Sequence, residues 1–301
     1  IKFGCGFNVL PMWHPLRLAE DFAMVDILTG GRVIFGVGRG YHTREVESFG
    51  APLIDGDANR ELFEEQFEII MKAFNQESFS HQGKHYTLPP DVSYRGYQLK
   101  ELTLVPRPAH LPVETWQPIV SGTDRALNFM AKWGIKGMIL VTGEEYVDDW
   151  AHRYQEANAR AGRELQLGEN LGLGLWCYID DSHEKAEKAL EPLFEEHVKF
   201  AAPLGMLRYS DDNMEQTGPG GAARHIAAGA NFRDVIQKRA WFAGSPEETI
   251  AYLKELEDKY PGLEHIMLGF PMGASVQQFK EQMTRFAKQV MPAFGPQTVK
   301  A

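Results

Sequence analysis

Glycines and an arginine follow an apolar, strand-like run, and they form the first pattern in the sequence that could bind a ligand. The segment Gly36-Val37-Gly38-Arg39-Gly40 overlaps the end of an expected strand over residues 32–37. Glycine at the carboxyl end of a strand lets a flat ligand approach the backbone, and the Arg39 cation can pair with a phosphate or an anionic ring. A dinucleotide-binding fingerprint is disfavoured because Tyr41 stands where that motif needs its third glycine. We interpret the segment as part of a ligand site, and a turn that simply requires glycine is the alternative.

A second candidate site is formed by Ser121, Gly122 and Thr123, between an expected strand over 118–121 and an expected helix over 123–133. Backbone N–H groups at the start of a helix, together with two hydroxyls, make a natural anion site. Plain N-capping by Ser121 or Thr123 is the alternative. Taken together with the glycine segment one strand earlier, these residues favour a phosphate site.

The other polar residues predict neither a metal site nor a catalytic base. The cysteines Cys5 and Cys177 lack neighbouring ligands, and no Gly-x-Ser-x-Gly nucleophile motif occurs. The paired carboxylates at 64–65 and 148–149 are expected on solvated helix faces. No metal-binding spacing connects the histidines His14, His42, His81, His85 and His110. The catalytic residues are therefore left unassigned.

The elements that must position these groups alternate between short apolar runs and longer helical periods. Strands are expected over residues 1–10, 32–37, 118–121, 137–141, 171–179 and 265–270. Helices are expected over 16–28, 59–74, 123–133, 144–160, 182–200, 246–259 and 276–290. This alternation predicts an α/β fold with a parallel sheet covered by helices.

Local signals mark several boundaries. Gly30 and Gly31 are expected to end the first helix, and capping boxes are expected at Thr142–Glu145 and Ser245–Glu248. Residues 76–117 are interpreted as an excursion from the core, and residues 203–240 show no clear period. The chain is interpreted as one domain over 1–301. Six strand–helix units are counted where a closed barrel needs eight, and the chain begins directly in a strand at Ile1.

Composition excludes several classes of protein. The 301 residues carry 31 Lys and Arg against 41 Asp and Glu, a formal net charge of −10, and 44% are hydrophobic, which excludes a disordered chain. Nucleic-acid binding is disfavoured because the chain has no basic tract. A membrane span is disfavoured because no apolar run approaches the roughly 18–20 residues that it needs. A signal peptide is not expected. The two cysteines are expected to be buried and reduced, as in a cytoplasmic protein.

Several motifs together resemble the bacterial luciferase-like flavin monooxygenase family. They are Val9–Asp21 (VLPMWHPLRLAED), Val25–Arg32 (VDILTGGR), Gly36–Tyr41 (GVGRGY), Phe79–Tyr86 (FSHQGKHY), Gly244–Glu248 (GSPEE) and Val290–Phe294 (VMPAF). The resemblance covers most of the chain and weakens through 87–117 and 203–240. It implies a TIM-type (β/α)8 barrel that lacks its first two βα units in this chain. The family's catalytic histidine lies on the second strand and would then be absent from these residues.

The resemblance also implies a set of cofactor-binding residues. They are Gly6, Phe7, Asn8, Gly38, Arg39, Gly40, Tyr41, Ser121, Gly122 and Thr123. The segment 6–8 would support the flavin ring, often through a non-prolyl cis peptide, and Arg39 would help to hold the reduced flavin and its phosphate. Gly38 stands where luciferase has a reactive cysteine, so oxygenation is expected without light emission. Residues 121–123 would form the phosphate loop, and residues 203–240 would form a mobile lid that shields the flavin from water.

The function implied is a cytoplasmic monooxygenase that uses O2 and reduced FMN supplied by a separate flavin reductase. A hydrophobic substrate of aldehyde, alkane or terpene type is expected, with a homodimeric assembly. An apolar pocket is expected from Trp13, Trp116, Trp176, Phe270 and Met272, for which core packing is an equal alternative. A deazaflavin-dependent oxidoreductase on the same barrel and a non-catalytic flavin-binding partner subunit remain the alternative functions.

Overall fold

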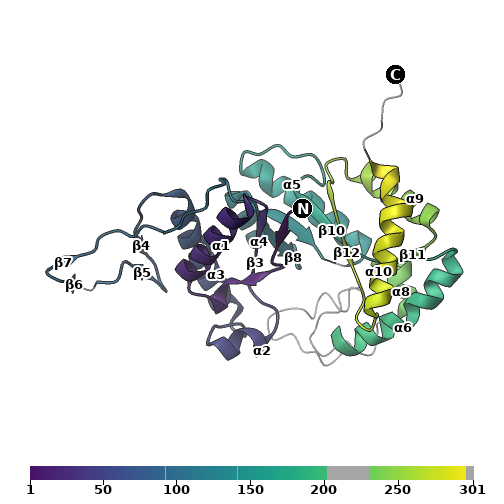
Figure 1. Cartoon of the computed structure of the whole chain (residues 1–301), viewed down its shortest axis with the longest axis horizontal. Helices are drawn as coiled ribbons and strands as arrows, with labels where there is room; N and C mark the ends of the chain where they lie inside the picture. Colours follow the sequence, from purple (N-terminus) through teal and green to yellow (C-terminus); the bar gives the residue numbers. More distant parts are fainter. Residues whose placement is uncertain (92, 141, 202–230, 296–301) are drawn as a thin grey trace, which may run out of the picture. The chain divides into compact units, whose positions relative to one another are not determined.

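The computed structural model describes residues 1–91, 93–140, 142–201 and 231–295 (Figure 1). The chain divides into two compact units, Ile1–Pro118 and Ile119–Ala301, and each is described by itself.

Unit 1 is a parallel sheet centred on β3 (Val33–Gly38). The strands β1 (Phe3–Gly4) and β2 (Asn8–Val9) pair with successive parts of β3, and β8 (Thr115–Ile119) also pairs with it. The prediction of a single strand over 1–10 is therefore wrong, because residues 5–7, which lie between β1 and β2, do not pair with β3. Cys5 is consequently exposed rather than buried, whereas Cys177 is buried as expected.

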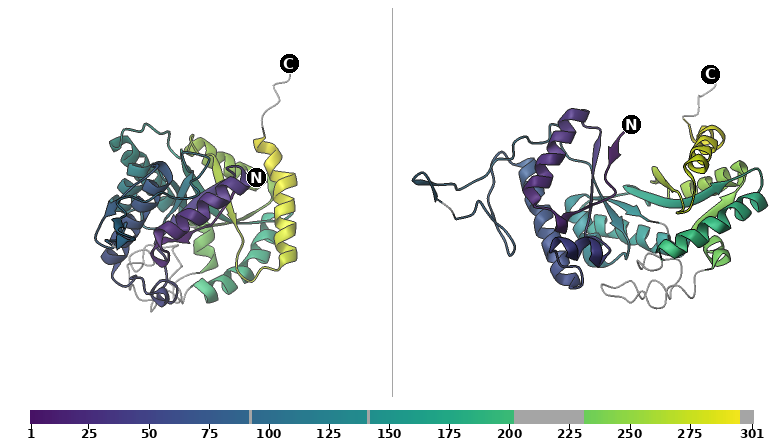
Figure 2. Two further views of the ribbon diagram at one scale, coloured as in Figure 1. Left: turned by 60° about the vertical axis from the view of Figure 1, so that its left-hand side comes forward. Right: turned by 60° about the horizontal axis from the view of Figure 1, so that its bottom comes forward.

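Two helices cover one face of this sheet, α1 (Pro15–Thr29) and α3 (Gly56–Asn75), and they lie side by side (Figure 2). Their aromatic side chains meet the sheet at Phe35, whose ring centroid lies 4.7 Å from that of Phe22 and 5.6 Å from that of Phe74. Helix α1 ends at Gly30, whose φ of 62° is the left-handed conformation that glycine permits, as predicted. Phe35 therefore faces the helices. Because neighbouring strand residues point to opposite faces, Gly36 and Gly38 face the other side.

The loop after β3 contains α2 (Thr43–Val46) and η2 (Glu47–Phe49), and η1 (Leu10–Met12) follows β2. The excursion expected at 76–117 contains two short hairpins, and β6 and β7 form the tip of a projecting arm in Figure 1. The hairpin strands are β4 (His81–Gln82), β5 (Thr87–Leu88), β6 (Ser93–Tyr94) and β7 (Tyr97–Gln98). The buried carboxylate of Asp26 on α1 accepts hydrogen bonds from the backbone N–H groups of Ala109 (2.7 Å) and His110 (3.1 Å). This fastens the returning end of the excursion to the helix.

Unit 2 is a parallel sheet centred on β10 (Leu171–Ile179), which matches the expected strand. β9 (Lys136–Ile139) pairs with residues 171–173, and β11 (Trp241–Gly244) pairs with residues 176–179. β12 (His265–Gly269) pairs with residues 172–176. Residues 172–173 of β10 pair with both β9 and β12, and residue 176 pairs with both β11 and β12. Two strands that pair with the same residue lie on opposite edges, so β12 occupies one edge of β10, and β9 and β11 share the other. This order differs from the sequential order of a closed barrel, in which β11 would separate β10 from β12.

The described helices of unit 2 follow the predicted alternation, except that Phe232–Gln237 was not predicted to be helical. They are α4 (Asp124–Trp133), α5 (Glu144–Arg160), α6 (His183–Ala201), α8 (Phe232–Gln237), α9 (Pro246–Lys259) and α10 (Val276–Arg285), followed by the π-helix η5 (Phe286–Val290) and the 3-10 helix η6 (Met291–Phe294). The capping box at Ser245 and Glu248 is confirmed in both directions. The one expected at Thr142–Glu145 is wrong: Gly143 is the N-cap of α5, without a side-chain cap. Instead, the Glu144 N–H donates to the Lys238 carbonyl oxygen (3.0 Å).

Candidate functional site

The three glycines of the segment 36–40 differ in whether the surrounding structure requires glycine at their positions. A Cβ at Gly36 would lie 1.9 Å from the Cys5 carbonyl oxygen, and one at Gly40 would lie 2.2 Å from Cγ2 of Val46, where φ is also +85°. The turn alternative therefore applies to Gly40, whereas Gly36 lies within β3 and is required by the close approach of the Cys5 backbone. A Cβ at Gly38 would meet only ordinary contacts, 3.4 Å to Cβ of Phe7 and 4.0 Å to Cγ of Pro118. Gly38 is thus the glycine of the segment that backbone geometry does not require.

The face of the unit 1 sheet opposite α1 and α3 is lined by small and flat groups around Gly38. Gly36 of β3 pairs with Trp116 of β8. Two residues further along β8, Pro118 lies beside Gly38. Phe7 lies within contact of the Cβ positions of both Gly36 (3.1 Å) and Gly38 (3.4 Å). We call Phe7, Gly38 and Pro118 the platform. Gly38 adds no side chain to this platform, so a flat group could approach its backbone there.

The segment 6–8 contributes Phe7 to this platform. The Gly6–Phe7 peptide bond is cis. Asn8 is fixed because its Nδ2 donates to the Gly36 carbonyl oxygen (2.8 Å). The structure therefore brings Gly6, Phe7 and Asn8 together with Gly38.

Arg39 follows the platform directly and is held by a residue that the sequence analysis did not select. Nη1 of Arg39 donates to Oδ1 of Asn59 (3.0 Å), and Nδ2 of Asn59 donates to the Arg39 carbonyl oxygen (3.1 Å). Asn59 lies in the first turn of α3 and is fully buried. The signal that could have found it is a polar residue four positions before Phe63, on the apolar face of the expected helix.

Tyr41 is placed differently from the other members of the segment. It is 54% exposed, and its ring lies edge-on to His42 with centroids 6.4 Å apart. His42 is the N-cap of α2, since its Nδ1 accepts from the backbone N–H of Arg44 (3.0 Å). The printed ring contact of Tyr41 is thus with the residue that caps α2.

The candidate phosphate loop belongs to unit 2, at the start of α4. Gly122 has a φ of +51°, and a Cβ there would lie 2.3 Å from Cδ1 of Trp150, so glycine is required by the loop itself. Thr123 is the N-cap of α4, yet its side chain makes no capping hydrogen bond. Ser121 and Thr123 are both exposed. Plain capping by Thr123 is therefore not observed, and its hydroxyl remains compatible with anion binding.

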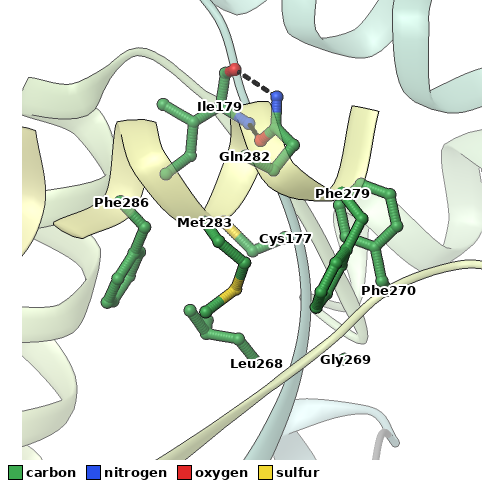
Figure 3. A pocket seen from close by; sticks show the side chains of 9 residues that line it. All are labelled: Cys177, Ile179, Leu268, Gly269, Phe270, Phe279, Gln282, Met283 and Phe286. Atoms are coloured by element: carbon green, nitrogen blue, oxygen red, sulfur yellow. Dashed lines mark hydrogen bonds between the residues drawn. The ribbon is translucent and has the colours of Figure 1, made fainter. Parts of the chain in front are cut away.

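The expected apolar pocket is largely core packing or exposed surface. Trp116 is buried, whereas Trp13 and Met272 are each more than 40% exposed. Trp176 stacks on Trp241, with centroids 5.0 Å apart and an interplanar angle of 11°. Phe270 lines a cavity of about 20 Å³ with Cys177 and Met283 among others (Figure 3), far below the several hundred Å³ of an organic ligand site.

His197 of α6 packs into the same aromatic core. Its ring centroid lies 4.4 Å from that of Trp176 and 5.3 Å from that of Trp241. Burial lowers the pKa of His197 to about 4, so the imidazole is neutral at physiological pH. Burial likewise raises the pKa of the Cys177 thiol to about 12, which keeps it protonated.

The expected lid lies mainly outside the described residues. Positions 203–230 are not described, while 231–240 contain α8 and the approach to β11. Among the described residues, His, Cys, Asp and Glu side chains form no cluster of three that could hold a metal ion. None of the described helices combines the length and apolar character needed to cross a membrane.

Comparison with known proteins first identifies the class. The oxygenating constituent of 3,6-diketocamphane monooxygenase from Pseudomonas putida, solved in complex with FMN, is similar in fold, with a TM-score of 0.71 and 17% identity over 97% of this chain and 79% of that chain. The class is therefore an α/β fold similar to TIM barrels, which confirms the predicted fold class. The absence of two barrel units stays a prediction.

The family follows from the sequence. The sequence model of the luciferase-like monooxygenases matches residues 1–261, so the chain belongs to that family.

The curated relatives include one named as flavin-dependent and one named as F420-dependent. The oxygenase component of flavin-dependent trigonelline monooxygenase from Acinetobacter baylyi is 24% identical, over 99% of this chain and 78% of the relative. The alkanal monooxygenase alpha chain of Photobacterium leiognathi is also 24% identical, over 97% and 79%. An F420-dependent glucose-6-phosphate dehydrogenase from Amycolatopsis mediterranei is 24% identical too, over 93% and 75%. A shorter match, 34% identical to an uncharacterized protein of Sinorhizobium fredii, spans 33% of this chain and only 27% of that protein.

Proposed function

We propose that this protein is an FMN-dependent monooxygenase that receives reduced FMN from a separate reductase and oxygenates a small hydrophobic molecule. The observation that carries the proposal is the platform: Gly38 has room for a side chain that the backbone does not exclude, and Phe7 and Pro118 flank it. Family membership makes a flavin the natural occupant. When bound, reduced flavin supplies the electrons for activating O2, which is chemistry that amino-acid side chains lack.

The residues of this chain would bind and orient the cofactor. Phe7 and Gly38 would contact the ring, and Asn8 fixes the segment that carries Phe7 through its bond to Gly36. The guanidinium of Arg39 would pair with an anionic group of the cofactor. Ser121, Gly122 and Thr123 would bind the phosphate through hydroxyls and the N–H groups at the start of α4. Gly40 and Tyr41 complete the proposed set, with Gly40 acting through the shape of the turn.

A deazaflavin-dependent oxidoreductase is the second candidate, supported by the F420-dependent relative. Both cofactors present a flat tricyclic ring and a phosphate, so the platform and Arg39 suit either. They differ in chemistry, because a deazaflavin transfers hydride and does not activate O2. Reactivity with O2 therefore separates the two functions.

The partners proposed are a flavin reductase, O2, a hydrophobic substrate of aldehyde, alkane or terpene type, and a second copy of the chain. The reductase is supported by a relative that is named as an oxygenase component. Helix α1 presents Met24, Ile27 and Leu28 to solvent, which supports homodimerisation through a helix that follows an early strand. Sedimentation analysis of the wild type and of Leu28→Glu tests the dimer: a monomeric wild type contradicts it.

The test of function is an anaerobic titration with reduced FMN and with reduced F420, followed by admission of O2. Tight binding of FMN, with O2 consumed and flavin absorbance returning through a transient species, is the expected result. Preferential binding of F420 without O2 consumption would contradict the monooxygenase and favour hydride transfer. Binding of neither cofactor would contradict both functions.

A further inference from the structure

Asn59 holds Arg39 at both its side chain and its backbone. Its Oδ1 accepts from Nη1 of Arg39 (3.0 Å), and its Nδ2 donates to the carbonyl oxygens of Arg39 (3.1 Å) and Pro52 (2.8 Å). The residue is 0% exposed. One buried amide therefore fixes the arginine and closes the loop between positions 39 and 52.

The chemical type of this residue matters as much as its contacts. A carboxylate at position 59 would fix a guanidinium equally well, but its negative charge would offset the positive charge of the arginine. The neutral amide of Asn59 orients Arg39 and adds no negative charge of its own. An arginine side chain loses rotamer entropy when an anion fixes it, and a cation that is already oriented loses less.

We infer that Asn59 is a positioning residue that orients the Arg39 guanidinium for the phosphate of the flavin. This inference rests on the proposed function. Asn59 acts through Arg39, so its effect should appear in the part of the binding that depends on the phosphate. Riboflavin has the same ring as FMN and no phosphate, and the ratio of the two dissociation constants isolates that part.

The experiment measures dissociation constants for reduced FMN and reduced riboflavin under anaerobic conditions, for the wild type, Arg39→Ala, Asn59→Ala and the double variant. Asn59→Ala should lower the preference for FMN over riboflavin by about tenfold, the effect of one well-placed charged hydrogen bond. The double variant should show no lower preference than Arg39→Ala alone, because both substitutions remove the same interaction. Asn59→Asp keeps the shape and the acceptor, so it serves if the alanine variant does not fold, and it should lower the preference as well.

Gln66→Ala is the matched control. Gln66 is also a buried amide on α3, and its Nε2 donates to the Trp13 carbonyl oxygen (2.8 Å) and the Tyr86 hydroxyl (2.9 Å), with no bond to Arg39. It should lose comparable stability and keep the wild-type preference for FMN.

The outcomes separate this inference from the proposed function. If Arg39→Ala lowers the preference and both Asn59 variants keep it, the positioning role is wrong and the proposed site stands. If Gln66→Ala lowers the preference as much as Asn59→Ala, the effect is general loosening of α3 and the inference is again wrong. If the wild type binds riboflavin as tightly as FMN, the phosphate role of Arg39 fails, and the inference fails with it.

Discussion

Gln282 of α10 pairs with Ile179 of β10 as a neighbouring strand residue would. The Ile179 N–H donates to Oε1 of Gln282 (2.7 Å), and Nε2 of Gln282 donates to the Ile179 carbonyl oxygen (2.9 Å), as the dashed line in Figure 3 marks. The pairing of β12 with β10 reaches only residue 176, so the helix side chain satisfies the backbone beyond it. A buried backbone group left without such a partner is costly.

Gln282→Leu should therefore destabilise the protein by about 1–3 kcal/mol, because both backbone groups of Ile179 lose their partner while the side-chain volume is nearly kept. Urea unfolding measures the change. Gln277→Leu is the control, since Gln277 is an exposed residue of the same helix and its side chain donates to Glu281 (2.6 Å). Equal effects of the two substitutions would contradict a special role for the Ile179 pairing.

The glycines at 36 and 38 should respond oppositely to alanine. Gly36→Ala would place Cβ 1.9 Å from the Cys5 carbonyl oxygen, so the chain must shift, with a cost of several kcal/mol or loss of folding. Gly38→Ala should change the free energy of unfolding by less than about 1 kcal/mol, because its contacts are ordinary. Thermal melting of the two variants tests the pair. A Gly38→Ala protein as unstable as Gly36→Ala would show that the platform has no room.

Arg39→Ala should weaken the binding of reduced FMN by roughly 1.5–3 kcal/mol through loss of a charged hydrogen bond. Anaerobic titration measures the dissociation constant. Arg17→Ala provides the control, because Arg17 is an exposed arginine paired with Glu20 (2.9 Å). An unchanged constant in Arg39→Ala removes Arg39 from the proposed site.

Thr123 offers a cleaner test of the phosphate loop than Gly122. Any side chain at Gly122 would collide with Trp150, so a substitution there would disturb the loop even if no phosphate binds. Thr123→Val removes a hydroxyl that makes no capping bond, so stability should change by less than about 0.5 kcal/mol while FMN binding weakens about fivefold to tenfold. Titration with FMN and unfolding in urea are both needed. A variant that loses stability but binds FMN normally would identify Thr123 as a cap after all.

The sequence predicted correctly those helix ends that a few adjacent residues determine. The helix stop at Gly30 and the capping box at Ser245 are confirmed, because a few adjacent residues determine each. The box at Thr142 failed because the start of α5 is fixed by the Lys238 carbonyl, which is remote in sequence. The strand β11 was not predicted because its four residues directly precede a strong helix signal.

Some features of the candidate site could likewise be predicted from adjacent residues, and others depend on residues that are remote in sequence. Glycines after a strand are visible in the sequence, but only the tertiary structure distinguishes Gly38 from Gly36 and Gly40, since the distinction depends on Cys5, Phe7 and Val46. The apolar pocket was predicted from residue type alone, and packing placed Trp176 against Trp241 instead.

Acid should destabilise the aromatic core around His197. Its pKa falls from an ordinary value of 6.5 to about 4 on folding, so the unfolded chain binds more protons between these values. The free energy of unfolding should therefore decrease as the pH falls from about 6.5 to 4, by roughly 3 kcal/mol at the lower end. Urea unfolding across this pH range measures the decrease.

His197→Phe keeps an aromatic ring among Trp176 and Trp241 and removes the titrating group. The variant should lose this part of the pH dependence while other carboxylates and histidines continue to contribute. His183→Phe is the control, because His183 is exposed on the same helix and pairs with Glu187 (3.3 Å). If His197→Phe and the wild type show the same slope between pH 6.5 and 4, His197 titrates normally in the folded protein, and its burial does not govern acid stability.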